Sequence, residues 1–242
     1  MMTDVPEPRI SYDGRPWRCH VLWPLLLAAL FASIGVEMVA VLLFRLIGKN
    51  LPTLLAEAVI QSMGLATLLA LLSIFPPRWK LPDKLGIRPP RWLDLGIVVL
   101  GLCMIYPWQI FTTVIWEVLL RFCKLSCSAH QALIVECSKA SPLHFIAMLA
   151  VAGMLIPIVE EVFFRRVLYG LLRPVGMVPA MFATALIFSA MHGFLHGFPA
   201  LFGLGLVLQW QYVQSRNLLT PIATHMIYNL TSLTLVYLIG LN

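Results

Sequence analysis

The chain is a succession of long apolar stretches separated by short polar ones. Most of these stretches reach the roughly 20 residues that cross a bilayer. The stretches cover residues 21–46, 52–75, 93–121, 143–172, 177–195, 199–214 and 218–240. They lack the two-residue alternation of barrel strands, and an open sheet cannot satisfy its backbone in lipid. The pattern therefore predicts an all-α, polytopic transmembrane helical bundle.

Two of these stretches differ from simple spans. The fourth would be about 45 Å long as a helix, so its end is expected to emerge into the headgroups. The fifth and sixth are short, and a tilted or re-entrant pair over residues 177–214 is an alternative to two full spans.

Composition agrees with a membrane protein. The 242 residues are 60% hydrophobic and only 12% charged, about half the charged fraction of a soluble domain. The net charge of +6 would also fit a nucleic-acid partner, but the basic residues lie in short loops beside apolar stretches. In that position they orient a protein in the bilayer and contact anionic headgroups. We therefore expect the lipid bilayer, and no nucleic acid, as the partner of these charges.

The distribution of basic residues predicts the orientation. Loop 76–92 contains five lysines and arginines against one aspartate, and residues 1–20 hold three arginines. Short basic loops stay inside, so we expect a cytoplasmic tail over 1–20, transmembrane helices over 21–140 and an N-terminus inside a bacterial inner membrane. Loop 122–142 then faces outward. Its cysteines allow a Cys127–Cys137 bridge or free thiols.

Two adjacent glutamates interrupt the fourth apolar stretch. Glu160 and Glu161 would lie in hydrocarbon, where one charge costs about 2.5–3.5 kcal/mol on insertion scales. Arg165 follows Glu161 by four residues and shares its helical face. A buried ion pair that only fixes helix packing would explain Glu161 and Arg165. It would not explain Glu160, which points about 100° away and has no local cation.

Two later stretches also carry polar groups. His192 ends the segment FSAMH, and His225 and Asn229 lie four residues apart in HMIYN. Alone, each could be a core residue or a hydrogen-bonding contact between helices. Because polar membrane residues face the bundle interior, we expect them to converge with the glutamates on one site.

These three segments together resemble the CPBP family, the CAAX-protease and bacteriocin-processing (Abi) intramembrane proteases. The family pattern is Glu-Glu-x-x-x-Arg, then Phe-x-x-x-His, then His-x-x-x-Asn or Asp. It is matched in order by EEVFFR (160–165), FSAMH (188–192) and HMIYN (225–229). The resemblance covers about residues 143–240 and implies a bundle of roughly eight helices, which sets the expected count at seven to eight. Residues 141–242 would be the catalytic core.

The resemblance also implies an activity, hydrolysis of a peptide bond near a terminus of a membrane-associated protein or peptide. By matching, Glu160 would be the general base, acting on a water with His192, and His225 and Asn229 would stabilise the oxyanion. Glu161 and Arg165 would support the site. No cofactor is expected. Zinc held by Glu160, His192 and His225 is the alternative. Substrates would be prenylated proteins, bacteriocin leaders or proteins with a C-terminal sorting tail.

Two other functions fit the composition, a non-catalytic scaffold or immunity protein and a membrane transport component. Transport is disfavoured because the polar cluster occupies one half of the chain and no inverted repeat is visible. One conflict arises within the protease interpretation. The simple topology puts Glu160 and His225 toward the inner half of the membrane and His192 toward the outer end of span five.

Overall fold

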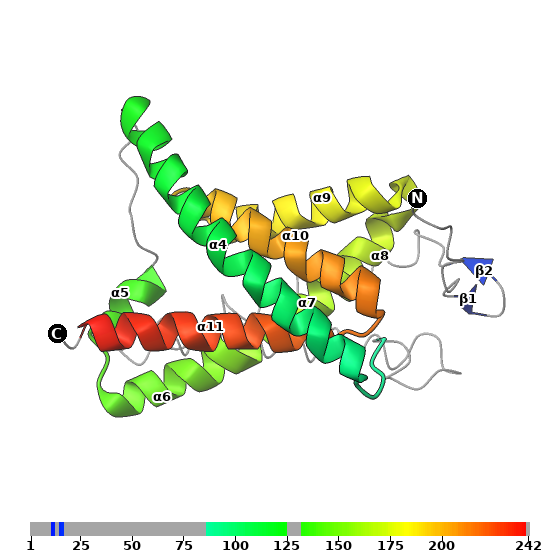
Figure 1. The fold of residues 1–242 in the computed structure, drawn as a ribbon, viewed down its shortest axis with the longest axis horizontal. Helices are drawn as coiled ribbons and strands as arrows, with labels where there is room; N and C mark the ends of the chain where they lie inside the picture. Colours follow the sequence, from blue (N-terminus) through cyan, green and yellow to red (C-terminus); the bar gives the residue numbers. More distant parts are fainter. Residues whose placement is uncertain (1–10, 13–14, 17–85, 125–131, 241–242) are drawn as a thin grey trace, which may run out of the picture.

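The computed structural model describes residues 11–12, 15–16, 86–124 and 132–240, and these are almost entirely helical (Figure 1). Ser11–Tyr12 (β1) and Arg15–Pro16 (β2) pair antiparallel. The helical elements are, in order, α4 (Trp92–Phe122), α5 (Ala132–Ser138), α6 (Pro142–Ala150), η1 (Val151–Leu155), α7 (Ile156–Glu161), η2 (Val162–Leu168), α8 (Tyr169–Leu172), η3 (Arg173–Val175), α9 (Met177–Met191), α10 (Phe198–Ser215) and α11 (Leu219–Gly240).

The five C-terminal spans expected from the sequence correspond to helices with nearly the same ends. Among the described residues, three helical stretches are long and apolar enough to cross a membrane: Trp92–Phe122, Pro142–Leu168 and Leu219–Gly240. The all-α membrane class is confirmed. The first two expected spans, 21–46 and 52–75, lie outside the described residues, so the count of seven to eight helices stays a prediction.

One long helical stretch carries the two glutamates, and it is not a uniform α-helix. It begins at Pro142 after the N-cap Ser141, whose hydroxyl accepts the His144 N–H at 3.4 Å. It then alternates between α and π geometry, with η1 and η2 as π segments on either side of α7. Such π segments are rare and often occur at functional sites. Glu160 and Glu161 end the short α segment between them.

Helix α4 packs against both α10 and α11 and crosses them obliquely (Figure 1). Buried side chains from α4, η2, α9, α10 and α11 form one core around Phe188. Polar contacts accompany this packing. The Gln211 amide donates to the Ile97 carbonyl at 2.8 Å, and the Tyr228 hydroxyl donates to Gln109 Oε1 at 2.7 Å.

A polar clamp joins the start of α4 to the turn between α10 and α11. The Arg88 guanidinium donates to both oxygens of Asp94 at 2.8 Å and to the Ser215 carbonyl at 2.6 Å. The Asn217 amide, fully buried, donates to the Arg88 carbonyl at 3.2 Å. From the sequence alone, Arg88 is expected only to act as one of the basic residues of loop 76–92. The structure shows that it also fixes the position from which α11 begins.

The far end of α4 contacts the loop before α10. The Trp116 indole donates to the Leu195 carbonyl at 2.8 Å, whereas Arg88 reaches Ser215 at the other end of α10. Helices α4 and α10 are therefore antiparallel, and α9 and α11 run opposite to α10 (Figure 1).

An axial offset of α9 resolves the conflict over His192. Both His192 and His225 approach Glu160. His192 lies 15 residues after Met177, the first residue of α9, whereas His225 lies only six residues after Leu219, the first residue of α11. At about 1.5 Å per residue, α9 is displaced along its axis by roughly 13 Å relative to α11. Helix α9 begins at Met177, as the sequence predicted.

The cysteines of the described residues are free thiols. Cys137 is buried and its thiol donates to the Leu233 carbonyl at 3.4 Å, while Cys103 and Cys123 are exposed. Burial raises the pKa of the Cys137 thiol. Cys127, its candidate disulfide partner, lies outside the described residues.

Candidate active site

A fully buried ion pair anchors the site. Arg165 Nε donates to Glu161 Oε2 at 2.7 Å and Nη2 donates to Oε1 at 3.3 Å, with neither side chain exposed. The guanidinium also donates to the Gly205 carbonyl at 3.2 Å. At Gly205, a Cβ would lie 3.1 Å from the Ala185 Cα, so glycine lets α10 approach α9 closely. The pairing expected from the spacing of four residues is present.

Glu161 also holds His225. His225 Nδ1 lies 3.0 Å from Glu161 Oε1. Because the carboxylate accepts, Nδ1 carries the hydrogen and donates it. This contact orients the imidazole, whose other nitrogen, Nε2, lies 3.6 Å from Glu160 Oε2.

His192 reaches Glu160 from α9. Its Nδ1 lies 2.8 Å from the Phe188 carbonyl, which can only accept, so Nδ1 carries the hydrogen here as well. Nε2 of the neutral ring is then an acceptor, and it lies 3.9 Å from Glu160 Oε1. This distance exceeds a direct hydrogen bond.

Glu160 therefore lies between two histidines, each fixed by a contact on its far nitrogen. Its side chain is 15% exposed and that of His192 is 22% exposed, whereas that of His225 is 2% exposed. A water between Glu160 and His192 could donate one hydrogen to each, which directs its oxygen lone pairs elsewhere.

Asn229 lies one turn beyond His225 on α11 but contacts a different element. Its Nδ2 donates to the Ala152 carbonyl in η1 at 3.0 Å. The amide nitrogen has two hydrogens, so one remains for another acceptor. The sequence did not predict this contact.

One aromatic ring, that of Phe188, lies beside three of the polar groups. The Phe188 ring lies 4.7 Å from the His192 ring and 5.9 Å from the His225 ring, measured between centroids. The Arg165 guanidinium carbon lies 5.3 Å from the same centroid. A cation over an aromatic face is favourable, so Phe188 stabilises the buried Arg165.

The donor set also bears on zinc. Zinc-bound histidines usually have their second nitrogen fixed by a carboxylate or carbonyl, as His225 and His192 do here. Among the described residues, however, no three His, Cys, Asp or Glu side chains converge closely enough to hold a metal. Five of the six candidate residues are brought together, with Arg165, His192 and His225 around the two glutamates, whereas Asn229 contacts Ala152 instead.

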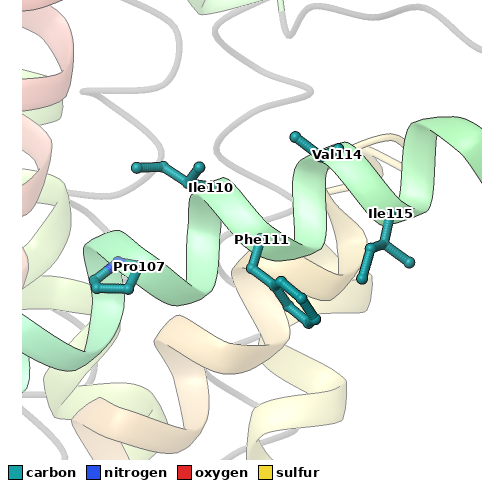
Figure 2. Close-up of a pocket in the computed structure, with 5 residues that line it drawn as sticks. All are labelled: Pro107, Ile110, Phe111, Val114 and Ile115. Atoms are coloured by element: carbon teal, nitrogen blue, oxygen red, sulfur yellow. The ribbon is translucent and has the colours of Figure 1, made fainter.

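An open pocket on the surface of α4 contains none of these groups. Figure 2 shows its lining of Pro107, Ile110, Phe111, Val114 and Ile115, all from α4 and all apolar. With no polar side chain in this lining, the pocket has no means of polarising an amide. We therefore place the candidate chemistry at the Glu160 cluster.

Comparisons with known proteins cover the same region. Residues 142–231, which include all six candidate residues, match the Rce1-like family, described as type II CAAX prenyl endopeptidase Rce1-like. The chain is also 25% identical over 201 residues to the membrane-embedded CAAX protease MroQ of Staphylococcus aureus (strain USA300). That alignment covers 76% of this chain and 79% of the relative. No solved structure gives a significant match.

Proposed function

We propose that this chain, a membrane protease of the CPBP family, hydrolyses a peptide bond near a terminus of a membrane-associated protein or peptide. The observation that carries the proposal is the position of the Glu160 carboxylate between Nε2 of His192 and Nε2 of His225. A scaffold needs the buried Glu161–Arg165 pair but has no use for a partly exposed carboxylate facing two histidines.

In the proposed reaction, Glu160 is the general base. A water bound between Glu160 and His192 gives its proton to the carboxylate as its oxygen attacks the amide carbon. The tetrahedral intermediate then collapses, the C–N bond breaks, and the proton passes to the leaving amine. One product carries a new carboxylate and the other a new amino group. General-base catalysis of this kind contributes about 10²–10⁴-fold in rate.

Two donors are proposed for the negative oxygen of the intermediate. One is the second Nδ2 hydrogen of Asn229. The other is Nε2–H of His225, because Nδ1–H is engaged by Glu161. That assignment requires His225 to be doubly protonated. Glu161 is already paired with Arg165, so the Glu160 carboxylate, 3.6 Å from Nε2, balances the added charge. Preorganised donors are worth about 10²–10³-fold each.

The reaction is tested by the fate of the water oxygen. Detergent-purified enzyme is incubated in ¹⁸O-labelled water with two peptides, one ending in a farnesylated C-a-a-X sequence and one carrying an unlipidated C-terminal tail. We expect one ¹⁸O atom in the new carboxylate of the preferred substrate. Cleavage of only one peptide class identifies the substrate type. If neither peptide nor a bacteriocin-leader peptide is cleaved, the scaffold interpretation is favoured.

Orientation is a separate prediction. Lys124 and Arg216 are both exposed, both have positive φ, and they lie at opposite ends of the antiparallel pair α4 and α10. The Arg216 end also holds Arg88 and Arg91, so the positive-inside rule makes it cytoplasmic. In sealed cells, and with the five native cysteines replaced by serine, an impermeant maleimide should label Lys124→Cys and not Arg216→Cys. Labelling of Arg216→Cys and not Lys124→Cys would show that the predicted topology is inverted, including the N-terminus expected inside.

Metal independence is the third prediction. Because the Glu160 carboxylate can act as base without a Lewis acid, purified active enzyme is expected to contain well under one zinc per chain. The zinc content is measured by elemental analysis, and peptide cleavage is measured at increasing concentrations of a metal chelator. Near-stoichiometric zinc that disappears with activity in His192→Ala would favour the metallopeptidase alternative.

A further inference from the structure

A proline lies three residues before Glu160, at a point where the helix changes its hydrogen-bond pattern. The Ile156 N–H donates to the Val151 carbonyl, five residues back. In the same pattern, the next N–H would belong to residue 157 and would reach the Ala152 carbonyl. Residue 157 is proline, which has no N–H. The Ala152 carbonyl therefore receives no main-chain donor from that position.

Asn229 supplies the missing donor. Its Nδ2 reaches the Ala152 carbonyl at 3.0 Å, from a helix 77 residues farther along the chain. A buried carbonyl is rarely left without a partner, and Ala152 is only 3% exposed. The N–H that Pro157 lacks and the amide that Asn229 brings thus complement each other.

Gly153, the residue after Ala152, allows α11 to approach η1 closely. At Gly153, a Cβ would lie 2.6 Å from Cδ2 of Leu230, the residue after Asn229. Glycine therefore allows α11 to lie against η1 at the level where the Asn229 amide reaches Ala152. A larger side chain at position 153 would displace the Leu230 side chain.

We propose that Pro157 is a positioning residue for Asn229. By withholding an N–H, it reserves the Ala152 carbonyl for the Asn229 amide. That hydrogen bond fixes the plane of the amide and presents its second hydrogen to the substrate. The consequence for catalysis rests on the proposed function, since it assigns Asn229 as an oxyanion donor. The hydrogen bond between Asn229 and Ala152, and the effect of Pro157 on it, do not depend on the proposed function.

The first test is Pro157→Ala. The N–H that this substitution introduces can compete with Asn229 for the Ala152 carbonyl. The anchor of Asn229 is then weaker, and kcat should fall by about 10–100-fold with little change in KM. The melting temperature should hold or rise, because a proline leaves a helix interior. If Pro157 had only a structural role, Pro157→Ala would lower the melting temperature and leave kcat unchanged. Pro107→Ala is the matched control, since Pro107 also lies inside a membrane helix, α4, and lines the apolar pocket of Figure 2. Its kcat should not change.

The second test requires no substrate. Asn229→Ala should lower the melting temperature by a few degrees, because the Ala152 carbonyl loses its side-chain donor. In the Pro157→Ala background, the N–H introduced at position 157 can replace that donor, so the same substitution should cost clearly less. Equal losses in both backgrounds, or full kcat in Pro157→Ala, would overturn the inference. If the wild type cleaves no peptide while the two stability losses differ as expected, the proposed function fails and the positioning relationship stands.

Discussion

Glu160→Gln is expected to reduce peptide hydrolysis by about 10²–10⁴-fold while leaving the protein folded. Glutamine keeps the shape of the side chain and its hydrogen-bonding capacity but cannot take a proton from water. An uncharged amide is also cheaper to place in the bundle than a carboxylate, so the melting temperature should not fall. Peptide cleavage and thermal unfolding are measured in parallel on monodisperse, detergent-purified protein.

The matched control for this variant is Glu117→Gln. Glu117 also lies on a membrane helix and pairs with an arginine four residues away, Arg121, but on the exposed side of α4. Its loss should leave cleavage unchanged. Normal cleavage by Glu160→Gln, or a loss of activity that only follows loss of folding, would contradict the proposed mechanism and favour a scaffold.

Glu161→Gln should instead act first on stability. It leaves Arg165, which is fully buried, without its charge partner. Breaking a buried pair by removing one member costs about 3–5 kcal/mol, whereas removing both charges is far less damaging. We therefore expect a large fall in the free energy of unfolding for Glu161→Gln and a partial recovery for the double variant Glu161→Gln with Arg165→Gln.

The double variant separates packing from chemistry. If Glu161 orients His225 through the 3.0 Å contact, the double variant should remain poorly active although it is stable. Denaturant unfolding and peptide cleavage of the same preparations are compared. Recovery of activity together with stability would limit Glu161 and Arg165 to a packing role.

The sequence predicted much of this fold for simple physical reasons. Helix ends in a membrane protein follow the ends of apolar runs, so the expected spans 93–121 and 218–240 agree with α4 and α11 within one or two residues. The pairing of Glu161 with Arg165 follows from their spacing on one helix. The approach of His192 and His225 to Glu160 was implied by the family resemblance, and the structure brings these groups together.

Other features depend on how helices sit against one another, which spacing within one helix cannot show. The axial offset of α9 relative to α11 cannot be derived from the spans, so the simple topology left His192 at a different level from Glu160 and His225. The contact of Asn229 with Ala152 depends on the π geometry of η1. Proline three residues before the glutamates was visible in the sequence, but its effect on a carbonyl five residues back was not.

The polar clamp at the start of α4 bears on what counts as a folding unit in this chain. The family match begins at residue 142, yet Asp94 and Arg88 complete the turn from which the histidine-bearing last helix starts. Helix α4, which also precedes the matched residues, contributes Ile105 to the central core. The segment that carries the three motifs is therefore not a separable module. Evolution or engineering that exchanges the N-terminal helices must preserve this junction, or His225 loses its register.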